Sequence, residues 1–327
     1  MKRILAIFID ILAFSYLLAC LTFLLHNFSG LSIRPAIWII MSLIFTIISH
    51  ILKDSIGIRL YDIYQPGKFT RSLSGWVTII ILILTFVTGW IIVEVNPAYF
   101  FEGAGNTKGI LAGLFSPNLS QLQPMLSALI ETIFLALLAT VFAIPFAFAF
   151  SFMAARNLMP KTFLGNTAYI SIRTLATFFR SVEAIIWAII FCVWVGIGPF
   201  AGMLALMIHS IAALTKLYSE QIENIDHGQV EAITSTGAST LQIWIYAVIP
   251  QILSPFLAFT IYRWDINVRM ATIVGFVGGG GIGLALQQEQ QLLRWHSVGL
   301  IIWLIAITVW IMDMVSAKVR QRLLDHE

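Results

Sequence analysis

Charged side chains are scarce in this chain of 327 residues. They make up 11% of the sequence, whereas soluble domains carry about a quarter, and 59% of the residues are hydrophobic. The mean hydropathy is +0.91. This composition excludes a soluble enzyme or binding domain and predicts a protein embedded in the lipid bilayer. The net charge is only +3, and we expect no nucleic-acid partner.

Cysteine is also rare in this sequence, and a phosphate-binding loop motif is absent. The two cysteines, Cys20 and Cys192, lie within apolar runs, so we expect small apolar residues rather than a disulfide or a metal pair. No Cys/His cluster has metal-ligand spacing, and no metal site is predicted. The pattern GxxxxGK[ST] is absent, so the chain does not hydrolyse ATP by that route. We predict a protein that is not an enzyme, has no catalytic residues and binds no cofactor itself.

Long apolar runs dominate the sequence. A membrane span needs about 20 mostly apolar residues, and each span is expected to be helical, because a backbone in lipid must satisfy its own hydrogen bonds. The predicted fold class is therefore an all-α membrane protein. About eight transmembrane helices are expected, at residues 4–26, 33–52, 75–95, 125–153, 170–195, 198–217, 248–272 and 297–316.

The distribution of lysine and arginine predicts the orientation. With the N-terminus in the cytoplasm, only Arg34, Lys108 and Arg294 fall outside. Both termini are then cytoplasmic, and the residues that fall inside are Lys2, Arg3, Lys53, Arg59, Lys68, Arg71, Arg156, Lys161, Arg173, Lys216, Lys318, Arg320 and Arg322. The apolar run after Lys2-Arg3 lacks a small-residue cleavage site, so a retained first helix is expected rather than a secretory signal.

Glycine and proline divide the chain into parts. Residues 96–124 are rich in both and are expected to form an extracytoplasmic linker, in which residues 110–115 could form a short helix at the membrane surface. The linker separates a three-helix membrane module at 1–95 from a second membrane domain at 125–327.

One inside loop breaks the charge pattern. Residues 218–249 carry Glu220, Glu223, Asp226 and Glu231 but no lysine or arginine. An acidic loop on the cytoplasmic side suggests a basic protein partner rather than lipid headgroups, and the alternative is an ordinary solvated loop.

A short motif within this loop is the most informative feature. Glu231 and Ala232 are followed by Gly237, which permits a turn with positive φ and would divide the loop into two short helices nearly at right angles. Pro250 is placed to start the next span. This layout resembles the EAA loop of bacterial ABC importer permeases. That pattern is Glu-Ala-Ala, three residues, Gly and then Ile-x-Leu-Pro. This chain has Ile233 in place of the second alanine, and Ala247 and Ile249 in place of the isoleucine and leucine before Pro250.

The surrounding stretches look like the phosphonate-type permease. They are VGIGPFAG at 195–202, ALMIHS at 205–210, YRWDINVR at 262–269 and VGFVGGGGIG at 274–283. The resemblance covers about residues 100–327 and implies a five-helix core of a type I ABC importer in the bacterial inner membrane. It also implies a second copy of the chain, an ABC ATPase dimer that holds ATP-Mg, and a periplasmic or lipid-anchored binding protein. The cargo would be a phosphonate, phosphite or related phosphorus oxyanion.

An oxyanion that crosses a membrane needs cationic or donor groups along its path. The candidates for this pathway are Arg180, Glu183, His209, Arg263, Asp265, Asn267 and Arg269. We expect Arg263 and Arg269 to flank the outer mouth, with Asp265 neutralising one of them. The alternatives are a bundle-locking ion pair for Arg180 and Glu183, which are helical neighbours by spacing, snorkelling for the two other arginines, and helix packing for His209.

A run of glycines follows the seventh predicted span. Gly278, Gly279, Gly280, Gly281 and Gly283 are expected to form an outer gate, through a broken helix or close backbone approach. A less favoured alternative is that helix N-termini there offer amide donors to an anion.

The N-terminal part has a weaker resemblance, to the RDD membrane domain. Arg3, Asp10 and Asp54 match the arginine and two aspartates that give that family its name, although the Ser-x-Gly-Lys-Arg run is not matched. Asp10 is expected to face other helices and to pair with Arg3 or Lys53. The alternative is three extra packing helices.

Alternating access is the expected mechanism, with a helix at 228–241 transmitting motion from the ATPase. Three alternatives remain open at this point: a secondary transporter or channel without an ATPase, an ABC permease for another small solute, and a membrane scaffold that transports nothing.

Overall fold

The computed structural model describes residues 2–29, 35–61, 72–103, 105, 107–160 and 162–324. Within these ranges the regular structure is helical, and the chain divides into two compact units, Met1–Gly105 and Asn106–Glu327. The division falls inside the predicted linker. Four charged residues that entered the orientation argument, Arg34, Lys68, Arg71 and Lys161, lie outside the described residues.

Unit 1 is built around its first helix. The described elements are α1 (Lys2–Ser29), α2 (Pro35–Ile51), α3 (Ile56–Leu60), α4 (Leu73–Ile92) and α5 (Pro97–Gly103). Helix α1 packs against α2, α3 and α4. A Cβ added to Gly57 would lie 2.2 Å from the carbonyl oxygen of Ala6, so only glycine fits where α3 meets α1.

Asp10 is fully buried in unit 1 and faces the other helices, as the sequence predicts. Its carboxylate accepts hydrogen bonds from the Gly57 backbone N–H (2.7 Å) and the Ser55 hydroxyl (2.6 Å), and it lies 2.9 Å from His50 Nε2. These groups replace the expected partner, Arg3 or Lys53. Arg3 precedes Asp10 by two helical turns, or about 10 Å, whereas the α2–α3 connection crosses directly beside Asp10.

Asp54 binds a different part of unit 1, the first turn of α4. It accepts hydrogen bonds from the Leu73 backbone N–H (2.6 Å) and the Ser74 hydroxyl (2.5 Å), and so it fixes the start of α4. The two aspartates that suggested the RDD resemblance therefore each hold a helix junction of unit 1.

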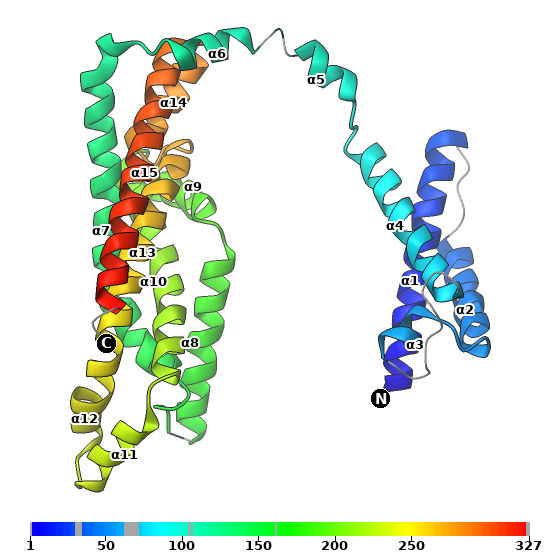
Figure 1. The fold of residues 1–327 in the computed structure, drawn as a ribbon, viewed down its shortest axis with the longest axis horizontal. Helices are drawn as coiled ribbons and strands as arrows, with labels where there is room; N and C mark the ends of the chain where they lie inside the picture. The colour runs from blue at the N-terminus through cyan, green and yellow to red at the C-terminus, as the bar shows by residue number, and fades with distance from the viewer. Residues whose placement is uncertain are drawn as a thin grey trace. The chain divides into compact units, whose positions relative to one another are not determined.

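Unit 2 contains the remaining elements. They are α6 (Lys108–Phe115), a short 3-10 helix (Leu119–Gln121), α7 (Leu122–Ala154), α8 (Phe163–Ser181), α9 (Ala184–Val195), α10 (Pro199–Glu223), α11 (His227–Ser235), α12 (Thr240–Ile243), α13 (Ile249–Gly275), α14 (Gly281–Gln291) and α15 (Trp295–Leu324). Figure 1 shows α11 and α12 projecting from one end of this unit, and α6 and α14 at the other.

Helix α10 forms the centre of unit 2, in contact with α7, α8, α9 and α13. Small residues allow the close approach. Ala136, Ala139, Ala143 and Ala147 of α7 are fully buried at spacings of three and four residues, which place them on one face.

The membrane-crossing helices differ from the prediction in two places. Six described stretches are long and apolar enough to span: Lys2–Asn27, Leu73–Ile92, Leu119–Ala154, Pro199–Glu223, Thr240–Gly275 and Trp295–Leu323. The span predicted at 33–52 corresponds to α2, whose described apolar part, Ile39–Ile51, is shorter than these. The span predicted at 170–195 is not one straight helix, because α8 and α9 meet at 88°. Counting that pair as one span gives seven among the described residues.

The predicted surface helix of the linker is α6, and it packs on α15. A Cβ added to Gly113 would lie 2.2 Å from the Trp295 carbonyl oxygen, and the Trp303 indole N–H donates to the Leu114 carbonyl at 2.8 Å. The second half of the linker is therefore part of unit 2 rather than a free connection.

Candidate functional site

The segment at residues 224–248 connects α10 to α13 and contains the motif singled out in the sequence. Helix α11 starts at Asp226, whose carboxylate accepts a hydrogen bond from the Gly228 backbone N–H at 2.9 Å. Glu231 and Ala232 are exposed on α11. The side chain of the motif glutamate is thus free to meet another molecule.

The predicted break at Gly237 is present. Gly237 has φ +78°, a left-handed conformation that glycine adopts without steric cost, and α11 ends at Ser235. A capping box of Ser239 and Gln242 then starts α12. The predicted 228–241 helix is therefore two helices with a turn between them.

Pro250 lies in the first turn of a membrane helix, as the sequence predicts. A π-helical turn at Trp244–Val248 joins α12 to α13, and Pro250 lies at the start of α13. Proline lacks a backbone N–H, and the wider π turn changes the hydrogen-bond register just before it. The helical path from Thr240 to Gly275 is consequently continuous.

The 224–248 segment is anchored to the core of unit 2. Val230 of α11 and Trp244 of the π turn pack on a buried cluster that includes Ile222, Val248 and Ile252. The Gln251 side chain accepts from the Asp226 backbone N–H (2.8 Å) and donates to the Ala247 carbonyl (2.7 Å). Packed side chains and the Gln251 amide therefore connect α11 to α13.

The pathway candidates separate into two groups. Arg263 is 5% exposed, and its Nε donates to the Ser210 hydroxyl at 3.0 Å while its Nη2 contacts His209 Nδ1. The fully buried Asn267 donates to Thr140 and Ser210, each at 2.8 Å. This network joins α7, α10 and α13 near the middle of each helix.

Arg269 belongs to another contact. Its guanidinium pairs with Asp265 at 2.5 Å and with Asp313 of α15 at 3.1 Å. Asp265 therefore neutralises Arg269 rather than Arg263, and the two arginines have different partners.

Arg180 and Glu183 are not neighbours on one helix. Helix α8 ends at Ser181, and Glu183 precedes α9 in an extended conformation with φ −59° and ψ 146°. Both side chains are exposed. The spacing argument for a helical ion pair does not apply, because the chain bends between them.

The glycine run crosses the end of unit 2 between α13 and α14. Gly278, Gly280 and Gly281 have positive φ, and a Cβ on Gly202 of α10 would lie 2.4 Å from the Gly279 carbonyl oxygen. The run combines a broken helix with close backbone approach. Its amides are occupied by side chains of α7: Glu131 accepts from Gly281 N–H (2.9 Å) and Thr132 from Ile282 N–H (2.7 Å). These bonds argue against the alternative of an anion at the start of α14. The fifth candidate glycine, Gly283, packs against the Thr272 carbonyl oxygen, 2.0 Å from where its Cβ would stand.

Comparison with known proteins assigns the chain. The family model described as "binding-protein-dependent transport system inner membrane component" matches residues 147–325, more than half of the sequence. The chain belongs to this family. It is thus a multi-pass membrane component of a transport system.

The permease is similar to several transport proteins along most of its length. It is 32% identical to the phosphite transport system permease protein PtxC of Stutzerimonas stutzeri, over 71% of this chain and 83% of that protein. It is 34% identical to the phosphate-import permease protein PhnE of Mycolicibacterium smegmatis, over 74% of this chain and 44% of that protein. A solved structure of the MetNI methionine ABC transporter shares the fold, with a TM-score of 0.56 and 18% identity, over 63% of this chain and 99% of the other.

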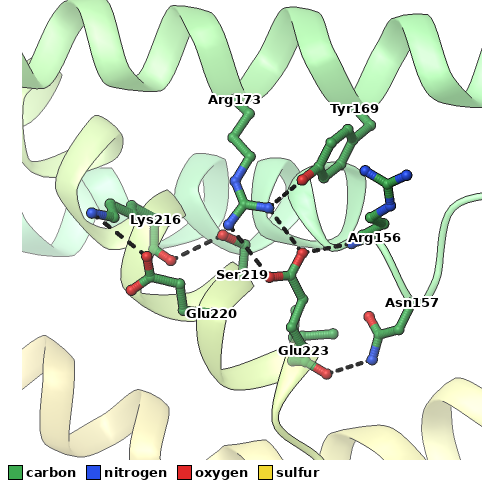
Figure 2. Close-up of polar contacts among 9 residues, drawn as sticks. Arg156, Asn157, Tyr169, Arg173, Lys216, Ser219, Glu220 and Glu223 are labelled. Atoms are coloured by element: carbon green, nitrogen blue, oxygen red, sulfur yellow. Dashed lines mark hydrogen bonds and ion pairs between the residues drawn. The ribbon is translucent and has the colours of Figure 1, made fainter. Parts of the chain in front are cut away.

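Most acidic residues of the permease loop have partners within the chain. Figure 2 shows Glu223 between α8 and α10: it binds Arg173 through Oε1 (3.0 Å) and Oε2 (3.3 Å), and it accepts from the Arg156 backbone N–H (2.8 Å). Glu220 lies 3.5 Å from Lys216, and Asp226 caps α11. Glu231 is the acidic residue of the loop that points outward for a partner.

Sequence reasoning missed the polar face of α8. Thr174 and Thr177 are exposed and precede Arg180 at intervals of three residues, and the exposed Asn166 lies on the same side of this helix two turns before Thr174. A test for polar rather than apolar periodicity would have found them.

Among the described residues, no group of three His, Cys, Asp or Glu side chains is placed to hold a metal ion.

Proposed function

We propose that this chain is the membrane-spanning subunit of an ATP-driven importer for a phosphorus oxyanion. It works as a pair of identical copies, with a cytoplasmic ABC ATPase dimer that holds ATP-Mg and with a periplasmic or lipid-anchored binding protein. The observation that carries the proposal is the exposed α11 helix with Glu231, followed by the turn at Gly237 and by a continuous helical path into the membrane domain.

The geometry supports a mechanical role for the 224–248 segment. When the ATPase dimer closes on ATP, it moves α11. Because Val230 and Trp244 pack on the same buried cluster as Ile252 of α13, that movement displaces α13. Helix α13 carries Arg263 and Asn267, so the displacement reaches the polar network near the centre of the unit.

The cargo class is supported by two lines of reasoning. The relatives named above are permeases for phosphite and phosphate. The membrane domain carries Arg263 near the middle of α13 and Arg180 at the end of α8, and positive groups within a membrane domain suit an anionic cargo.

A proton- or ion-driven transporter is the runner-up. It would need free carboxylates within the spans, but apart from Glu183 at the α8–α9 bend, the spanning carboxylates Glu131, Asp265 and Asp313 of unit 2 have partners within the chain. Glu131 accepts from the Gly281 backbone N–H, and Asp313 and Asp265 pair with Arg269. These contacts favour the ATP-driven alternative.

The test is reconstitution of the chain with its ATPase and binding protein in lipid nanodiscs. Loaded binding protein should stimulate ATP hydrolysis, and Glu231→Lys should remove that stimulation, because the contact charge is reversed while the subunit stays assembled. Gln229→Lys is the matched control, since position 229 lies about 200° around α11 from position 231 and gains the same positive group. Equal stimulation in wild type and Glu231→Lys would refute the coupling role.

The cargo is tested separately. Titration of the binding protein with phosphite, phosphate and methylphosphonate should give saturable binding of at least one of them, together with ATP-dependent uptake of the same compound. Uptake of an uncharged or cationic solute in place of all three would exclude the proposed cargo class.

A further inference from the structure

The bend between α8 and α9, residues 180–184, is unusual in its chemistry. Two charged side chains, Arg180 and Glu183, are exposed on it. The bend also breaks the backbone hydrogen bonding of a membrane segment, since α8 ends at Ser181 and α9 begins at Ala184. Exposed charge and broken helix structure within a membrane domain are tolerated where they line a water-filled path or are covered by protein.

The polar face of α8 leads to this bend. Thr174, Thr177 and Arg180 lie on it in succession, and all three are exposed. A helix that turned this face to lipid would leave the Arg180 guanidinium unsolvated, whereas the Thr177 hydroxyl donates to the Arg173 carbonyl at 2.8 Å. A water-filled route along this face would solvate the guanidinium at the bend.

His209 of α10 lies against the α8–α9 bend. Its ring interacts with the backbone of Arg180, where the last carbonyls of α8 lack helical partners. Its Nδ1 faces Arg263 Nη2. A guanidinium can only donate, so Nδ1 must be the acceptor and the His209 ring is neutral.

Positive charge at the bend is only partly compensated. Within the described part of the chain, the hydrogen-bond partners of the Arg263 guanidinium are the uncharged Ser210 and His209, and Glu183 acts on Arg263 through its charge without an ion-pair contact. Arg180 adds a second positive charge that also acts on His209. Two cations and one carboxylate leave a net positive charge at the bend.

Arg269 provides the contrast. It has two carboxylates, at 2.5 Å and 3.1 Å, so its charge is already balanced within the chain. Among the described residues, by contrast, neither Arg263 nor Arg180 forms an ion pair with a carboxylate.

We propose that the α8–α9 bend is an oxyanion-binding step on the transport route, at which the exposed Arg180 guanidinium contacts the phosphorus oxyanion and the buried Arg263 supplies a fixed second charge. The inference rests on the proposed function, and it assigns the cargo contact to this bend rather than to an outer mouth at Arg263 and Arg269. Arg180 suits the contact because a guanidinium presents paired donors to two oxygens of one anion.

The experiment uses the reconstituted complex of permease, ATPase and binding protein, and it compares Arg180→Gln with Arg180→Lys. Loss of the paired donors and the charge should lower uptake about tenfold in Arg180→Gln, with a smaller loss in Arg180→Lys, as expected for one charge-assisted contact. Lys318→Gln, which removes one exposed positive charge from α15, should leave uptake unchanged. In both Arg180 variants the loaded binding protein should still stimulate ATP hydrolysis, because the 224–248 segment is intact.

A direct readout uses Trp187, which stacks on Phe179 across the bend with ring centroids 5.1 Å apart. In complex labelled with 5-fluorotryptophan, the Trp187 signal, assigned by Trp187→Phe, should shift saturably with phosphite, phosphate or methylphosphonate, whichever is transported. The shift should vanish in Arg263→Gln. If Arg263→Gln does not fold, the signals of all its tryptophans lose their dispersion together. The wild-type titration then tests the inference by itself.

Several results would overturn the inference. They are unchanged uptake in Arg180→Gln, a wild-type Trp187 signal that no transported anion moves, or loss of uptake in Arg180→Gln together with loss of permease pairing, which would make Arg180 a contact between copies. Failure of the proposed function looks different, because wild-type complex would then show neither stimulated ATP hydrolysis nor oxyanion uptake.

Discussion

Neutralising Glu223 should loosen the joint between α8 and the end of α10. Glu223 is the last residue of α10, directly before the 224–248 segment, and its carboxylate accepts two hydrogen bonds from Arg173 and one from the Arg156 backbone (Figure 2). Because these hydrogen bonds connect α8 to the end of α10, we expect α8 to follow movements of the 224–248 segment. In Glu223→Gln we expect ATP to be hydrolysed with less transport, because α8 no longer moves with α11.

The size of the effect follows from the exposure of the pair. The Arg173 and Glu223 side chains are 33% and 26% exposed, which places them between exposed ion pairs, worth up to about 1 kcal/mol, and buried pairs, whose disruption costs about 3–5 kcal/mol. Glutamine keeps one acceptor oxygen, so a loss of about 1–2 kcal/mol is reasonable. That energy changes the population of the joined state by about 5- to 30-fold.

The assay is the number of anions imported per ATP in proteoliposomes. Glu220→Gln is the matched control: Glu220 lies one turn earlier on α10, 43% exposed and 3.5 Å from Lys216, and such a pair contributes only about 0.2–0.5 kcal/mol. The double variant Arg173→Glu/Glu223→Arg should recover part of the coupling, since the pair is restored in reverse. Equal coupling in Glu223→Gln and Glu220→Gln, or no recovery in the reversed pair, would refute the reasoning.

Three further predictions concern backbone and buried groups. Gly237→Val should cost about 1–2 kcal/mol at its φ of +78° and reduce ATPase stimulation, whereas Gly89→Ala, whose Cβ meets nothing within 4 Å, should not. Gly202→Ala should lower the thermal stability of unit 2 by about 1–3 kcal/mol, because its Cβ would lie 2.4 Å from the Gly279 carbonyl oxygen; an unchanged melting temperature would contradict the packing described. Asp10→Ala should destabilise unit 1 by about 1–3 kcal/mol through its unpaired donors, seen as faster proteolysis between α2 and α4, while leaving ATPase stimulation intact.

The exposed motif was predictable because its chemistry is local. The Glu231-Ala232 pair, the turn at Gly237 and the helical character on both sides follow from the sequence. The anchoring of Asp226 by Gln251 did not, because that contact joins residues 25 positions apart through a side-chain amide. The π turn at Trp244–Val248 was likewise invisible, since a widened turn leaves hydrophobic periodicity almost unchanged.

The pathway residues in the membrane domain show which features residue spacing alone does not predict. Counting apolar residues over 170–195 cannot detect the two extended residues, Val182 and Glu183, that separate α8 from α9. Similarly, Arg263 and Arg269 are both arginines on α13, and only the packing of α10 against one and of α15 against the other gives them different partners. Charge compensation is a property of neighbouring helices, so one helix read alone does not reveal it.

The polar face of α8 also constrains how the protein enters the membrane during synthesis. An arginine at the centre of a helix adds about 2.5–3.5 kcal/mol to insertion, and the 19-residue α8 carries Arg173 near its centre, with Arg180 at its end. The 12-residue α9 is apolar but too short to cross alone. Neither half is a self-sufficient insertion signal, so we expect the α8–α9 pair to integrate stably only once α10 has emerged, since Glu223 of α10 pairs with Arg173. Integration of this part of the chain would then lag behind its translation.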